Sequence, residues 1–383
     1  MSAREVRDEL QNGTPPATAT QEETTSFTFQ IQVPEETERV LAEIVIDDFE
    51  KAKQDRNSLD FGTTAKGEHL DFDTWLKRIE DLYHGYREAK EIPWKYCSNR
   101  SVRIATAIME MLHSRLFPAV WNEDLTRWRP GEITDVPKVE RVSKFMSWWI
   151  KVWAPMREFF ENWTKHSIGY GDTVTELSWD VEENETGEVI EMEPGLPPMK
   201  KVNRIERTKA RIVPKKSVYF FKGARDIEKD TVIFEEEFLY RSLDDMERNG
   251  QALNVSTKLK PFLPVAVSES TEPMEAERLK QVKIRNIPVK VLTWYGFYDI
   301  EGTGLPQSIK LMVAPEQRIY LGGIRMKDVT KTGKRPLEYV KYSSYLTKLE
   351  ELLGEGVLDQ VRELAEEMDA IFNQLTDANT LSV

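Results

Sequence analysis

The residue pattern of the chain changes at one segment, KVERVSKFMSWWIKVWAPMREFFENWTKHSIGYG (residues 138–171). Its apolar side chains keep helical spacing over about seven turns, which predicts a long helix. Pro155 lies inside this run. Because proline removes a backbone N–H donor and clashes with the preceding turn, we expect it to kink or split the helix. Gly169 and Gly171 end the helix, and beyond them apolar residues alternate with polar ones, as in strands.

The part of the chain before this segment is expected to be helical. Residues 1–34 are rich in Thr, Pro, Gln and Glu, which predicts disorder. Helical spacing then predicts one helix in VLAEIVIDDFEKAKQD and another in FDTWLKRIEDLYHGYREAKEI. A third helix is expected to begin at a cap formed by Ser98 or Asn99 and to stop at Pro118.

The part after it is expected to consist mainly of strands. A hairpin is predicted around Asn184 to Gly187, followed by strands in ARIVP, SVYFF and TVIFEEEFLY. Ser242 is expected to cap a short helix, and EAERLKQVK to form another. Three further segments predict an antiparallel group: PVKVLTWYGFYDI, QSIKLMVA and QRIYLG.

The last element, VLDQVRELAEEMDAIFNQL, has the pattern of an acidic amphipathic helix. Its predicted buried stripe consists of Leu358, Val361, Leu364, Met368, Ile371, Phe372 and Leu375. The fold class predicted is α+β, with a helical N-terminal half, an antiparallel β-rich middle and a C-terminal amphipathic helix. The predicted regions are a disordered acidic segment at 1–34, a helical region at 35–170, a β-rich region at 171–345 and a C-terminal helix at 346–383.

Composition excludes several classes of protein. The 383 residues include one cysteine, so a disulfide framework is impossible and a reducing compartment such as the cytoplasm is expected. No apolar run approaches the roughly 18 residues of a membrane span, and the polar N-terminus lacks the apolar centre of a signal peptide.

The net charge is −13; residues 1–60 (14 acidic, 6 basic) and 350–383 (9 acidic, 1 basic) each carry −8. The chain as a whole thus has no basic surface for clamping nucleic acid.

A search for catalytic patterns finds none that is complete. The chain has no glycine-rich phosphate loop, no Gly-x-Ser-x-Gly elbow and no histidine pair at zinc-binding spacing. Cys97, without a paired base, is expected to be inert. The loop from Asp299 to Gly304 is similar to a calcium loop but has Lys310 at the position of the bidentate glutamate, which favours a simple glycine turn. We therefore predict no enzyme, no cofactor and no metal site; a metal-dependent hydrolase with carboxylates from distant segments is the less favoured alternative.

Tryptophan is abundant in the segment at 138–171. The chain has ten tryptophans, more than one modest core usually takes. One interpretation of the cluster is a stacking platform for bases. Helical spacing instead favours a core or a subunit interface, where aromatic anchors are enriched. The candidate residues of an oligomer interface are Trp148, Trp149, Trp153 and Trp163.

Five landmarks follow one another along residues 90–383. The helix in NRSVRIATAIMEMLHSRLFPAVW precedes Trp128-Arg-Pro130, and the aromatic helix runs into Gly169-Tyr-Gly171 and a strand closing on Trp179. Two strand-rich passages follow, ARIVPKKSVYFFKGARDIEKDTVIFEEEFLYRSLDDMERNG and WYGFYDIEGTGLPQSIKLMVAPEQRIYLG. Gly354-Glu-Gly356 then opens the helix that carries Asn373-Gln-Leu-Thr-Asp377. In this order the landmarks resemble the portal proteins, the head-to-tail connectors of tailed bacteriophages.

The resemblance implies a structural subunit with a wing-like β-rich middle. About twelve copies would form a homo-oligomeric ring at the head vertex of the virion, assembled in the host cytoplasm. Such a ring nucleates the shell with capsid and scaffold proteins, docks the terminase motor and tail adaptor proteins, and passes double-stranded DNA during packaging and ejection. Portal chains continue into channel-lining helices, so residues 346–383 would begin a stem whose remainder is truncated or supplied by another chain. Another head or adaptor protein of the virion is the alternative.

Overall fold

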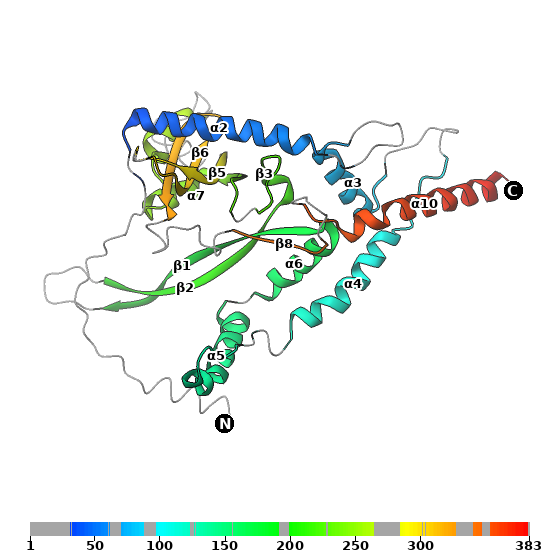
Figure 1. Ribbon diagram of the computed structural model, residues 1–383, viewed down its shortest axis with the longest axis horizontal. Helices are drawn as coiled ribbons and strands as arrows, with labels where there is room; N and C mark the ends of the chain where they lie inside the picture. Colours follow the sequence, from blue (N-terminus) through cyan, green and yellow to red (C-terminus); the bar gives the residue numbers. More distant parts are fainter. Residues whose placement is uncertain are drawn as a thin grey trace.

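The computed structural model combines helices with antiparallel sheets, which confirms the predicted α+β class (Figure 1). It describes residues 31, 33–59, 61, 70–87, 97–122, 126, 128–154, 156–190, 199–226, 229–263, 284–300, 302, 304–326, 340–346 and 353–381. The helix predicted at 275–283 lies outside the described residues, as does the disordered segment predicted at 1–34 apart from Ile31, Val33 and Pro34.

One antiparallel sheet has five strands that neighbour one another in chain order. The strands are β3 (Val218–Phe220), β4 (Val232–Leu239), β5 (Pro288–Tyr298), β6 (Gln307–Ala314) and β7 (Ile319–Arg325). Central strands β5 and β6 bury side chains on both faces, as expected for a sheet covered on both sides. The predicted antiparallel group is confirmed, and the turn glycines Gly302 and Gly304 between β5 and β6 have positive φ angles of 66° and 76°.

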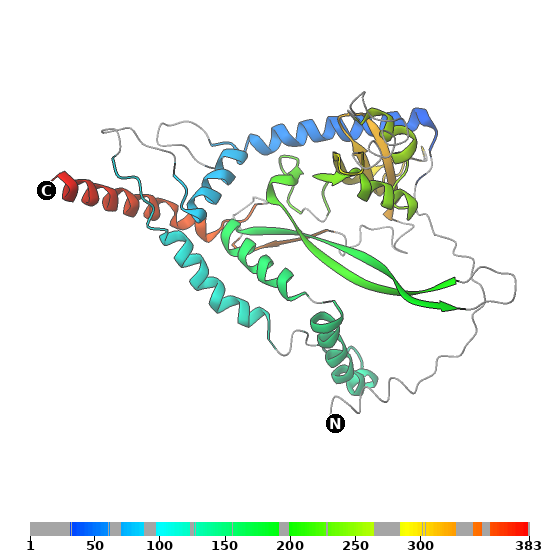
Figure 2. The ribbon, with the colours of Figure 1, turned by 180° about the vertical axis from the view of Figure 1, so that it is seen from behind.

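Helices cover both faces of this sheet. Helix α2 (Glu35–Asn57) runs along one face (Figures 1 and 2), where Leu41 and Val45 contribute to a core with apolar side chains of β5 and β6. The opposite face carries α7 (Tyr240–Arg248) and a π turn, η4 (Val255–Leu259). The sheet is therefore the middle layer of three.

The start of α7 differs from the prediction. The helix begins at Tyr240, so the cap predicted at Ser242 is wrong. Tyr240 is buried, and its backbone N–H donates to the carbonyl of Ile287 at 2.9 Å. Packing of this aromatic residue against the sheet, together with a bond from another segment, fixes the helix start in place of a local polar cap.

A second sheet extends from the body as a long ribbon (Figure 1). Its strands are β1 (Asp172–Ile190), β2 (Met199–Val213) and β8 (Val340–Ser344), with β1 in the centre. Val174 pairs with Val213 at the root of the ribbon. The hairpin predicted around Asn184 to Gly187 is wrong, because β1 runs through these residues and pairs with β2 on both sides of them. Asparagine and glycine permit a turn there, but cross-strand pairing up to Glu185 and again from Val189, with a shift of register between them, outweighs that local preference.

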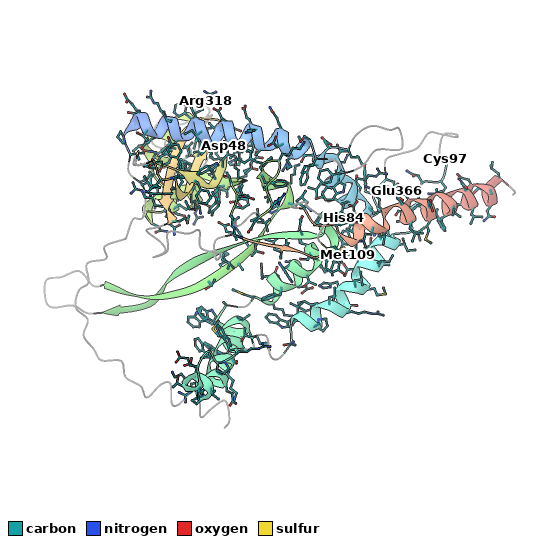
Figure 3. The ribbon with its side chains drawn as sticks, viewed as in Figure 1. Asp48, His84, Cys97, Met109, Arg318 and Glu366 are labelled. Atoms are coloured by element: carbon teal, nitrogen blue, oxygen red, sulfur yellow. The ribbon has the colours of Figure 1, made fainter. Side chains whose placement is uncertain are left out.

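Four helices form a separate core. They are α3 (Phe72–His84), α4 (Ile104–Val120), α6 (Arg157–Tyr170) and α10 (Val357–Leu381). Trp75, Met109 and Leu358 are among the side chains buried between them. Figure 3 shows Met109 where α4 approaches the beginning of α10.

The long aromatic helix divides as predicted. It forms α5 (Val136–Trp148), a π turn η2 (Trp149–Trp153) and, after a break between Trp153 and Arg157, α6. The boundaries of α4 were predicted less well, since it begins at Ile104 instead of at a cap formed by Ser98 or Asn99, and continues past Pro118 to Val120. Proline supplies no N–H to the carbonyl four residues before it, and α4 ends two residues after Pro118.

Arg56 connects the sheet to the helical core. Its side chain is 1% exposed, and its guanidinium lies 4.4 Å from the ring centre of Phe72 and 3.9 Å from that of Tyr219. It donates to the carbonyls of Lys216 and Val218 at 2.8 and 3.0 Å. A planar cation between two aromatic rings is an arrangement that Arg forms and Lys does not reproduce.

We expect Arg56→Ala to lower the free energy of unfolding by about 3 kcal/mol, because two buried carbonyls would lose their partner and a cavity would open. The measurement is chemical denaturation followed by circular dichroism. Arg39→Ala is the matched control, since Arg39 pairs with Glu35 on the exposed face of the same helix; this change is expected to cost less than about 0.5 kcal/mol. Equal losses for the two variants would contradict the connecting role of Arg56.

Candidate assembly surfaces

The start of α10 is fixed by a close approach of two backbones. Gly171 follows the end of α6 with a φ of 84°, a conformation that favours glycine. A Cβ atom at Gly171 would lie 2.2 Å from the carbonyl carbon of Glu355, and one at Gly356 would lie 2.0 Å from the carbonyl oxygen of Gly169. The contact therefore requires glycine on both segments, and it holds the beginning of α10 against the end of α6.

The inward face of α10 is polar and binds an extended segment of backbone. Asp369, Asn373 and Asp377 recur every four residues, so they lie on one side of the helix. Asp369 Oδ1 accepts from the N–H of Val102 at 2.7 Å, and Asp377 Oδ1 accepts from the N–H of Ser98 at 2.8 Å. We call these three side chains the polar face of α10.

Asn373 is the centre of the polar face. Its Oδ1 accepts from the N–H of Arg100 at 2.8 Å, and its Nδ2 donates to the carbonyl of the same residue at 3.0 Å. Its Oδ1 also accepts from the hydroxyl of Ser98 at 2.8 Å. Asn373 is buried, and it pairs with both backbone groups of Arg100, as a neighbouring strand would.

Two arginines hold the same helix from α3 and the residues after it. Arg78 of α3 donates to both carboxylate oxygens of Glu366 at 2.8 and 2.9 Å, and Figure 3 shows Glu366 on the side of α10 that faces α3. Arg87 forms an ion pair with Asp369, whose side chain is 5% exposed. A buried carboxylate needs such partners to remain charged. The sequence singled out Asn373 and Asp377 only through the portal resemblance, and it gave no role to Asp369.

Since the inward face is polar, most of the apolar stripe of α10 points outward. Leu358 is buried and Val361 packs partly against the helical core, as predicted. The rest of the predicted buried stripe is wrong: its residues are 36–59% exposed. They are Leu364, Met368, Ile371, Phe372 and Leu375, and we call them the outer stripe.

A second exposed apolar surface lies on α5 and η2. Phe145, Trp148, Trp149 and Trp153 contact one another, with ring centres 6.1–6.2 Å apart. The exposed fraction is 48% for Trp148 and 62% for the neighbouring Val152. We call Phe145, Trp148, Trp149, Val152 and Trp153 the tryptophan face. It contains three of the four tryptophans predicted from the sequence as interface candidates.

Trp163, the fourth candidate, lies apart from the other three. It is on α6, where it is partly buried and donates from its indole N–H to the hydroxyl of Ser343 in β8 at 3.1 Å. The contact joins α6 to the second sheet within one chain. The structure therefore brings Trp148, Trp149 and Trp153 together and places Trp163 elsewhere.

A small cavity lies where the end of α6 meets the second sheet, and two larger and more open hollows, of about 430 and 370 Å³, lie elsewhere among the described residues. The small cavity, of about 20 Å³, lies beside the ion pair of Lys215 and Asp172, whose atoms are 2.7 Å apart. This volume accommodates about one water molecule and no organic substrate. His166 and Tyr170 line it: burial lowers the pKa of His166, and burial followed by the charge of Glu80 raises the pKa of Tyr170 to about 12. Both side chains are neutral near pH 7.

Within the described ranges, no group of three or more His, Cys, Asp and Glu side chains has an arrangement that could hold a metal ion. None of the helices in this part of the chain is long and apolar enough to cross a membrane. The chain matches no model of a known protein family, and no curated protein matches it. The outer stripe and the tryptophan face are two exposed apolar surfaces among the described residues.

We expect Asn373→Ala to release the segment around Arg100. Both backbone groups of Arg100 would lose their partner, at about 0.5–1.5 kcal/mol for each hydrogen bond. Hydrogen exchange of the Arg100 amide should then accelerate by roughly tenfold or more. Gln374→Ala is the control, because Gln374 is the next residue and is exposed. Unchanged exchange at Arg100 in the Asn373 variant would contradict the role of the polar face.

Proposed function

We propose that this chain is a subunit of a portal-type ring at the head vertex of a tailed bacteriophage. The observation that carries the proposal is that landmarks of the portal resemblance, far apart in the sequence, meet in pairs. The segment of Asn99 binds the helix of Asn373 and Asp377, and Gly169–Gly171 contacts Gly354–Gly356. Landmarks that follow one another along this sequence and also contact one another form one structural unit, which supports interpreting them as one set.

The exposed apolar surfaces support an assembly subunit over an isolated monomer. Monomeric proteins rarely expose large contiguous apolar patches, and such patches mark sites of interaction. Here the outer stripe and the tryptophan face each expose several large side chains along one helix. In a ring, every subunit contacts two neighbours, so two distinct surfaces are required.

The charge of the chain suits the passage of DNA through such a ring. Strong phosphate contacts, each made by a lysine or arginine, would hold DNA in place. A net charge of −13 provides little general attraction for DNA, which favours sliding over clamping. In this proposal the energy for packaging is supplied by the terminase motor, and the subunit itself is not an enzyme.

The test is the assembly state of the purified chain. We expect light scattering at micromolar concentration to give a mass near 530 kDa, about twelve times the 44.5 kDa of one chain. Negative-stain images should show rings with a central hole. The control is Phe262→Ser, which removes a 63% exposed aromatic side chain from a region remote from α5 and α10 and should leave the ring intact.

Two results would contradict the proposal. One is a chain that remains monomeric under every assembly condition. The other is nuclease or nucleotidase turnover that requires Mg²⁺ or Mn²⁺ and is abolished by EDTA, because it would place metal-dependent chemistry in the chain itself. Rings with a copy number far from twelve would favour the adaptor alternative.

A further inference from the structure

We infer that the tryptophan face of one copy of this chain binds the outer stripe of α10 in the next copy. This inference rests on the proposed function, because it specifies the contact between neighbouring subunits of the ring. It concerns two surfaces on different elements: Phe145, Trp148, Trp149, Val152 and Trp153 on α5 and η2, and Leu364, Met368, Ile371, Phe372 and Leu375 on α10.

The outer stripe has the geometry of a helix that docks on a partner. Its five residues follow the spacing i, i+4, i+7, i+8 and i+11, which places them on one side of α10. The opposite side is already occupied by the contacts of Asp369 and Asn373 with residues 98–102. The helix therefore cannot rotate to bury its apolar side chains without losing these hydrogen bonds. A second molecule is needed to cover them.

The two surfaces do not meet within one chain. In Figures 1 and 2, α5 lies at one end of the molecule and α10 projects from another side, and α4 and α6 lie between them. Both α4 and α6 contribute buried residues to the core that includes the start of α10. Each surface is thus available to a different neighbour.

Charge decides which surfaces pair. The segment 136–153 carries four basic and one acidic side chain, a net charge of +3. The segment 357–381 carries one basic and six acidic side chains; Glu366 and Asp369 are paired with Arg78 and Arg87 on the inward side, whereas Glu363 and Glu367 are exposed. If either surface paired with itself, like charges would face each other. Pairing of one with the other brings opposite charges together, which favours correct encounters and suppresses wrong ones.

Individual charged residues lie at the borders of the apolar side chains. Arg141 precedes Phe145 by four residues, so it lies on the same side of α5. Glu367 precedes Ile371 by four residues and lies along the outer stripe in the same way. Both are exposed. The basic border of the tryptophan face and the acidic border of the outer stripe are complementary in charge.

Contact between two different surfaces is directional. When copies join head to tail by such a contact, they form a closed ring if the rotation between them closes, and an open filament if it does not. Each contact therefore needs one tryptophan face and one outer stripe. Two copies that together keep only one of each can form a dimer and nothing larger.

The test uses two double variants that each remove one surface. Trp148→Gln with Val152→Gln removes the tryptophan face, and Ile371→Gln with Leu375→Gln removes the outer stripe. All four positions are at least 48% exposed, and Gln is a good helix former, so both variants should fold. Circular dichroism and thermal unfolding check this before assembly is measured by light scattering at micromolar concentration.

We expect each variant alone to remain a monomer. An equimolar mixture should form a dimer of about 89 kDa, twice the 44.5 kDa of one chain, and nothing larger. In addition, Arg141→Glu should weaken association by roughly tenfold, and Glu367→Arg in the same chain should restore it. Phe262→Ser is again the control and should assemble like the unmodified chain.

Three results would overturn the inference and leave the proposed function intact, provided that the unmodified chain forms rings. They are rings from either double variant, dimers from one double variant alone, and a mixture that stays monomeric. An unmodified chain that forms open filaments through this pairing would support the inference and contradict the ring. An unmodified chain that remains monomeric would overturn both.

Discussion

The helical half of the molecule depends on the capture of one extended backbone segment by the polar face of α10. Successive side chains on one side of a helix, four residues apart, are separated by about 6 Å along its axis. Alternate residues of an extended chain are separated by about 6.6 Å. These spacings nearly match, which lets Asp369, Asn373 and Asp377 pair with Val102, Arg100 and Ser98 in order. The helix thus performs for this segment the role of a neighbouring strand.

This constraint inverts the usual amphipathic arrangement over most of α10. A surface helix normally turns its apolar side inward. Here the first turns do so through Leu358 and Val361, but further along the helix the inward positions are taken by acceptors and donors for backbone groups. Each of these hydrogen bonds contributes about 0.5–1.5 kcal/mol, and together they are comparable to the gain from burying an apolar side chain. The apolar stripe therefore faces outward as a consequence of satisfying the backbone.

Local patterns in the sequence predicted the elements correctly where local forces decide the structure. Alternation and β-branched residues identified β4 to β7, and Pro155 marked the region where the aromatic helix divides. The predictions were wrong where contacts between distant segments of the chain decide the structure. The α10 stripe was expected to be buried because its spacing is helical, but the segment that occupies the other side of the helix is some 270 residues away in the chain. In the same way, nothing near Arg56 indicates that a buried arginine will lie between Phe72 and Tyr219.

The same contacts that build the helical core also fix the direction of α10, which carries the outer stripe. Helix α10 is held against α6 by the contact of Gly171 with residues 355–356, and the segment before α4 is held by the polar face. Helix α6 follows η2 after a short link that contains the buried Ala154, so the tryptophan face is connected to this core. A ring closes only if every copy presents its two surfaces at the same angle. Glycines that permit backbone contact and buried polar side chains that allow few arrangements are suited to fixing the direction of α10, whereas a core of interchangeable apolar side chains would tolerate small rotations.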